Sequence, residues 1–134
     1  MAKTYLPDTG FWIALYANNE EAETIATIIE DDNILIPYPS MYEFLNSKFS
    51  RRGLAYEFQK LLKRPNIKKI YDDDYRDDSF DNFFYNAINY SLDVSLVDEV
   101  IKLMIIDPKL KVDFLISYDT SLLNYATAHG VETN

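Results

Sequence analysis

The stretch Phe114-Leu115-Ile116-Ser117-Tyr118-Asp119 joins a short apolar run to an acid. Three consecutive large apolar residues between polar neighbours are typical of a buried strand, which we expect over residues 112–118. A helix over Thr120–Ala128 follows, closed by Gly130. This end of the chain is therefore predicted to run from strand to acid to helix.

The beginning of the chain repeats this order. Lys3–Pro7 is predicted to form a short strand, and Asp8 follows it directly. Asp8-Thr9 is then a typical helix start before the apolar run Phe11–Tyr16. Between these units, apolar spacing and the Pro and Gly positions predict helices over 20–32, 39–52, 54–63, 80–90 and 95–106. Strands are expected over 33–38 and 67–71, and an acidic loop over 72–78.

Strands that alternate with helices indicate an α/β fold. Parallel strands need long crossover connections, and the helical segments supply them. We therefore expect a three-layer α/β/α sandwich with a mainly parallel central sheet, formed as a single domain over residues 1–134. In such sheets, ligands bind beyond the carboxyl ends of the strands. Asp8 and Asp119 should both lie at that edge.

Composition excludes several kinds of chemistry. The 134 residues contain no cysteine and one histidine, which rules out disulfide scaffolds, thiolate zinc sites and a cysteine nucleophile, and disfavours most hydrolytic triads. The sequence has neither an apolar run long enough for a membrane span nor a signal-peptide pattern, so we expect a cytoplasmic protein. Carboxylates, hydroxyls, amines and a metal held by oxygen ligands are the remaining candidates.

The charge is unevenly distributed. The net charge is −9, yet residues 48–69 contain eight basic residues and one acid, Glu57, a local charge of +7. A basic stripe beside an acidic pocket would suit nucleic-acid binding, and we name Lys48, Arg51 and Arg52 as candidate contacts. A solvated helix face explains the same pattern equally well.

Four acids are the candidate functional residues: Asp8, Glu43, Asp98 and Asp119. Each also has a purely structural explanation, because each lies near a predicted helix start, where an acid caps the helix or favours its dipole. Taken together they would repel one another and need countercharge. A divalent ion such as Mg²⁺ or Mn²⁺ is the natural source, because hard ions prefer carboxylate oxygens.

In the order of these motifs the whole chain resembles the PIN-domain ribonucleases, in particular the toxins of toxin–antitoxin pairs. Leu6-Pro7-Asp8-Thr9-Gly10 is similar to that family's first strand and aspartate, and Ile36-Pro37 with Tyr42-Glu43-Phe44-Leu45 to its second strand and helical glutamate. Ser95-Leu96-Val97-Asp98 resembles the segment of its third acid, and Ser117-Tyr118-Asp119 resembles its Ser/Thr-x-Asp motif.

The resemblance implies a PIN-like fold and a metal-dependent endoribonuclease. Asp8, Glu43, Asp98 and Asp119 would bind one or two Mg²⁺ or Mn²⁺ ions, with Thr9 and Ser117 as supporting hydroxyls. It also implies an RNA substrate, a cognate antitoxin protein and a homodimer. Asp119 is not followed within four residues by the further acid that many relatives carry.

Three alternatives stay open. The first is a PIN-like module without catalysis that binds protein or RNA, and the second is a nuclease that acts on DNA. The third is a signalling domain of the receiver type, whose parallel sheet also gathers aspartates. That class would need a lysine after the last strand, and residues 131–134 contain none.

Overall fold

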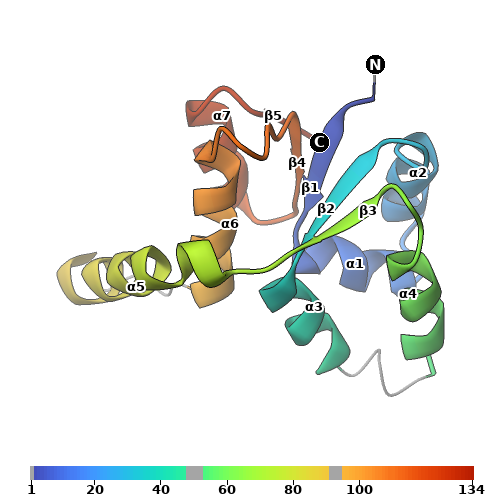
Figure 1. Ribbon diagram of the computed structural model, residues 1–134, viewed down its shortest axis with the longest axis horizontal. Coiled ribbons are helices and arrows are strands. Elements are labelled where there is room, and N and C mark those ends of the chain that lie inside the picture. The colour runs from blue at the N-terminus through green and yellow to red at the C-terminus, as the bar shows by residue number, and fades with distance from the viewer. Residues whose placement is uncertain (1, 48–52, 91–94) are drawn as a thin grey trace.

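The computed structural model describes residues 2–47, 53–90 and 95–134, which form an α/β fold (Figure 1). The strands are β1 (Thr4–Pro7), β2 (Asn33–Pro37), β3 (Ile67–Ile70), β4 (Phe114–Ile116) and β5 (Glu132–Thr133). The helices are α1 (Thr9–Tyr16), α2 (Glu20–Ile28), α3 (Tyr38–Leu45), α4 (Ala55–Leu62), the 3₁₀ helix η2 (Asp73–Tyr75), α5 (Arg76–Tyr90), α6 (Leu96–Ile106) and α7 (Thr120–Ala128).

The central sheet has the strand order β3-β2-β1-β4-β5, and all its strands are parallel. Pro7, the last residue of β1, is paired with Ile116, the last residue of β4. The direction of the strand order reverses between these two neighbours, which is the place where open parallel sheets bind ligands. A receiver domain has the order 2-1-3-4-5, so the observed order excludes that alternative.

Helices cover both faces of the sheet, as Figure 1 shows. Alternate strand residues point to opposite faces: Ile34 and Ile36 pack into the cluster formed with α1 to α4, while Leu35 packs into the cluster formed with α6 and α7. The expected three-layer α/β/α arrangement is confirmed, and the sheet is parallel throughout its described strands.

The prediction for residues 72–78 was wrong. Residues 72–78 do not form a loop: η2 and the first turn of α5 occupy most of this segment. Arg76 lies 3.4 Å from Asp72 and 3.0 Å from Asp73, and the Tyr75 hydroxyl donates to Asp107 at 2.5 Å. These contacts join two of the acids to one cation, and they join Tyr75 to the residue that follows α6. The segment therefore folds, although its charge suggested a solvated loop.

Helix limits also differ from the predicted ones. Helix α2 ends at Ile28, where the prediction was residue 32, and α3 ends at Leu45, where the prediction was residue 52. The Ser47 N–H and hydroxyl both donate to the Phe44 carbonyl, at 3.0 and 2.6 Å, which satisfies one of the carbonyls that lack a helical partner at the end of α3. Residues 48–52, the remainder of the predicted helix, lie outside the described residues.

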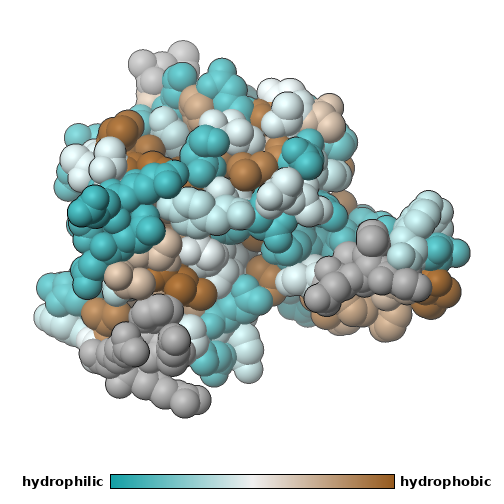
Figure 2. All heavy atoms as spheres, turned by 180° about the vertical axis from the view of Figure 1, so that it is seen from behind, coloured by the Kyte–Doolittle hydropathy of each residue, from teal (hydrophilic) through white to brown (hydrophobic). Residues whose placement is uncertain are grey.

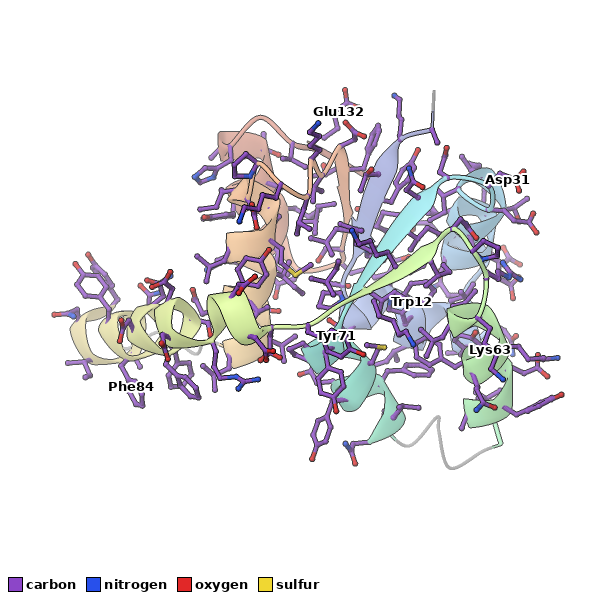
Figure 3. The ribbon with its side chains drawn as sticks, viewed as in Figure 1. Trp12, Asp31, Lys63, Tyr71, Phe84 and Glu132 are labelled. Atoms are coloured by element: carbon purple, nitrogen blue, oxygen red, sulfur yellow. The ribbon has the colours of Figure 1, made fainter. Side chains whose placement is uncertain are left out.

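Helix α5 projects from the body and contacts mainly α6 and η2 (Figure 1). Its outer half exposes large apolar side chains, with Phe84 54% and Ile88 75% exposed, and Figure 2 shows hydrophobic residues at its far end. In Figure 3, Phe84 extends from this helix, far from Trp12 in the body. None of the helices in the described ranges is both long enough and apolar enough to cross a bilayer.

Candidate functional site

A cavity of about 570 Å³ opens at the carboxyl ends of β1 and β4. The four candidate acids all line it. Its described lining consists of Asp8, Thr9, Gly10, Ile13, Glu43, Ser95, Asp98, Tyr118 and Asp119. Residues that are far apart in the sequence therefore meet at the edge where the sheet topology places a ligand site.

Asp8 caps a helix and faces the cavity at the same time. Its Oδ1 accepts the Phe11 N–H at 2.9 Å, and its Oδ2 accepts the Ser117 hydroxyl at 2.5 Å. The side chain is buried, and its position between β1 and α1 is fixed because its own N–H donates to the Ile116 carbonyl. The structural explanation for this acid is therefore correct, but it leaves the functional one open, since each carboxylate oxygen has a second lone pair.

Asp119 occupies the equivalent position after β4. Its Oδ1 accepts the Leu122 N–H at 3.1 Å, which caps α7. Its backbone N–H donates to the Ser117 hydroxyl oxygen at 2.9 Å. Ser117 thus joins the two acids, because its Oγ donates to one and accepts from the other.

Asp98 and Glu43 come from two further helices. Asp98 lies in the first turn of α6, where its N–H donates to the Ser95 hydroxyl at 3.4 Å. Glu43 lies on α3, which begins directly after β2, and its side chain is exposed. Thr9 lies beside Asp8, and its hydroxyl is buried without a hydrogen-bond partner among the described residues.

The acids act on one another electrostatically. Burial raises the pKa of Asp98 to about 6, with further contributions from the charges of Asp119, Asp8 and Glu43. Burial also raises the pKa of Asp8, and its bonds to Ser117 and Phe11 oppose this while Asp119 and Glu43 add to it. The ammonium of Lys102 opposes the shift of Asp98. The site therefore carries uncompensated negative charge.

The side chains fit a divalent ion that keeps part of its water shell better than an ion bound only by protein atoms. No group of three or more acidic, histidine or cysteine side chains within the described segments is arranged to hold an ion. Mg²⁺, however, usually keeps several waters and binds proteins through one or two carboxylates. The oxygen donors and the mutual repulsion at Asp98 match such an ion.

Lys48, Arg51 and Arg52, the predicted nucleic-acid contacts, lie outside the described residues. Among the described residues, Lys102 acts on Asp98, and it lies one helical turn further along α6 and 3.4 Å from buried Glu99. The spacing of Asp98 and Lys102 on one predicted helix could have revealed this pair.

Sequence reasoning also missed Tyr118 and Ile13 in the wall of the cavity. Tyr118 is the middle residue of Ser117-Tyr118-Asp119, and its side chain is 42% exposed. Burial and the charges of Glu21 and Asp8 raise its pKa, so it stays a neutral aromatic surface beside the acids. No pattern in a single sequence separates such a residue from an ordinary loop tyrosine.

Comparison with known proteins gives no matching family model and no match among curated proteins. The resemblance to PIN domains thus stays a prediction that rests on the motifs and their order.

Proposed function

We propose that this protein is a Mg²⁺- or Mn²⁺-dependent endoribonuclease of the PIN-domain kind. One observation carries the proposal: Asp8, Glu43, Asp98 and Asp119, from four separate parts of the chain, line one cavity at the carboxyl edge of the sheet. The choice of RNA comes from the motif resemblance. The cytoplasmic location stays a prediction.

The chemistry follows from the charges of the site. The four carboxylates would hold the ion, directly or through water, and the ion would neutralise phosphate charge and make a water more acidic. Asp8 is fixed by its bonds to Phe11 and Ser117, so it can orient what binds without reorganising. Glu43 and Asp119 are exposed and can accept hydrogen bonds from a water beside the substrate phosphate.

The assay for this proposal is cleavage of pooled cellular RNA by the purified protein. We expect cleavage with Mg²⁺ or Mn²⁺ and none with EDTA, because the carboxylates need the ion as countercharge. Asp98→Asn serves as the matched protein control. Intact RNA under every condition would refute the proposal, and cleavage of single-stranded DNA in preference to RNA would favour the DNA nuclease.

A second prediction concerns metal binding alone. Mn²⁺ at several times its dissociation constant should stabilise the wild-type protein by about 1 kcal/mol and raise Tm by about 3 to 6 °C at pH 8. Differential scanning fluorimetry measures this shift. Asp98→Asn should show less than half of it, and an equal shift in both proteins would place the ion elsewhere.

A non-catalytic PIN-like binding module is the second candidate. The observation in its favour is that no three potential ligand side chains in the described segments are arranged around a common ion position. Such a module would bind RNA or a protein without metal. It predicts no RNA cleavage and no Mn²⁺-dependent thermal shift, so the two experiments above separate the candidates.

We also propose a toxin role with a cognate antitoxin, on the strength of the motif resemblance. Burial, and after it the charges of the other acids, raises the pKa of Asp98, and a basic antitoxin side chain that enters the cavity would offset the repulsion among the acids. Co-purification from the native operon tests this. A protein that emerges alone from the intact operon would contradict the antitoxin prediction.

A further inference from the structure

The side chain of Asn134 extends the hydrogen bonding between β4 and β5. The two strands pair in parallel at Phe114 with Glu132 and Leu115 with Thr133. Beyond this pairing, Asn134 Oδ1 accepts the Ser117 N–H at 3.0 Å, and Asn134 Nδ2 donates to the Ser117 carbonyl at 3.1 Å. The side-chain amide thereby serves both backbone groups of Ser117, as a peptide group of a neighbouring strand would.

Ser117 is the residue that links the acids of the cavity. It is fully buried, its hydroxyl donates to Asp8 Oδ2 at 2.5 Å, and the same hydroxyl oxygen accepts the Asp119 N–H at 2.9 Å. The direction of the hydroxyl depends on the backbone of Ser117. That backbone is held by Asn134 on the side of β5.

We propose that Asn134 is a positioning residue of the carboxylate site, which acts through Ser117 on Asp8 and Asp119. It lies outside the lining of the cavity, so it touches neither substrate nor ion. The effect on catalysis rests on the proposed ribonuclease function, whereas the geometric link from Asn134 to Asp119 does not. Partners bonded directly to metal-binding side chains, as Ser117 is to Asp8, typically contribute 10- to 100-fold to activity or metal affinity. Asn134 lies one bond further back, so its effect should be near the lower end of that range.

The chain supplies a matched control in Asn66. Its Nδ2 donates to two backbone carbonyls, those of Glu30 and Asp32, both at 2.8 Å. Asn66 directly precedes β3, at the edge of the sheet opposite to the acids, and its own carbonyl accepts the Ile34 N–H. Asn134→Ala and Asn66→Ala each remove two bonds between a side-chain amide and the backbone, so their stability losses should be similar.

The test compares both variants with the wild type on a fluorophore- and quencher-labelled RNA oligonucleotide of mixed sequence, in Mn²⁺. Asn134→Ala should lower kcat by about 10-fold with KM changed less than about threefold, while Asn66→Ala keeps kcat within about twofold. Asn134→Asp keeps the acceptor for the Ser117 N–H but places a second acceptor against the Ser117 carbonyl, so it should lower kcat at least as much as Asn134→Ala. Wild-type kcat in Asn134→Ala, or an equal loss in Asn66→Ala, would overturn the proposal.

Amide hydrogen exchange followed by NMR tests the geometric link even if the wild type cleaves no RNA. Asn134→Ala should accelerate exchange at Ser117, which loses its acceptor, and also at Asp119, whose N–H is bonded to the Ser117 hydroxyl. Asn66→Ala should leave both rates unchanged. If the rate at Asp119 is unaffected by Asn134→Ala, Asn134 does not act through Ser117, and the proposal fails independently of the ribonuclease function.

Discussion

Replacing Asp98 by asparagine should abolish RNA cleavage and at the same time make the folded protein more stable. The variant removes a carboxylate from the cavity, and we expect a loss of about 100-fold or more in cleavage rate. It also removes a charge that burial and three neighbouring acids disfavour, as the pKa of about 6 at Asp98 indicates. A residue kept for packing would not combine these two effects.

The stability that Asp98→Asn gains over the wild type should increase as the pH rises. The folded protein holds the Asp98 proton more tightly than the unfolded chain, so ionisation costs stability as the pH rises from about 4 to about 6. A pKa change of this size corresponds to at most about 3 kcal/mol, and solvent screening at this partly exposed group reduces it to about 1 to 2 kcal/mol. Below pH 4 wild type and variant should be nearly equally stable.

Urea unfolding at pH 4, 6 and 8 measures this difference. Asp31→Asn is the control, because Asp31 is exposed in the turn between α2 and β2 (Figure 3). This turn lies at the amino ends of the strands, opposite to the carboxyl edge where the cavity opens. It should change stability by less than about 0.5 kcal/mol at each pH and leave cleavage intact. A variant Asp98→Asn that is less stable than wild type at pH 8 would show that Asp98 serves the fold.

The sequence was sufficient to predict a mainly parallel sheet with Asp8 and Asp119 at its carboxyl edge. A strand buried on both faces needs an apolar run such as Phe114-Leu115-Ile116, and the helix that follows needs a cap such as Asp119. Both requirements are local, so both are visible in the sequence. Parallel pairing then brings the ends of β1 and β4 together, which places Asp8 beside Asp119.

Features that depend on contacts between distant residues could not be predicted. Strand β5 has two residues, Glu132 and Thr133, with no apolar pattern, and it forms because β4 offers it a free edge. Segment 72–78 folds because Tyr75 bonds to Asp107, the residue that follows α6. The two hydrogen bonds between the Asn134 side chain and the Ser117 backbone likewise join residues 17 positions apart in the sequence. An asparagine at position 134 gives no sign of them in the sequence alone.

The largest stability effect is expected at Phe58, which lies at the centre of an aromatic cluster. Phe58 is fully buried. Its ring lies 4.5 Å from that of Phe44 on α3, and 5.9 Å from each of the rings of Trp12 and Tyr16 on α1. The cluster therefore attaches α4 to the helices that carry or begin at the acids Glu43 and Asp8.

Phe58→Ala should lower the free energy of unfolding by about 3 to 5 kcal/mol, because it removes a buried ring and leaves a cavity among three others. Domains of this size have about 5 to 15 kcal/mol in total, so the urea midpoint should fall steeply. Phe84→Ala, the same change on the exposed side of α5, should cost less than about 0.5 kcal/mol.

At temperatures where Phe58→Ala is fully folded, RNA cleavage should persist, because every acid is retained. Equal losses of stability in both variants would contradict the central place of Phe58 in the core, and lost cleavage in the folded Phe58→Ala protein would mean that the cluster also sets the position of Glu43.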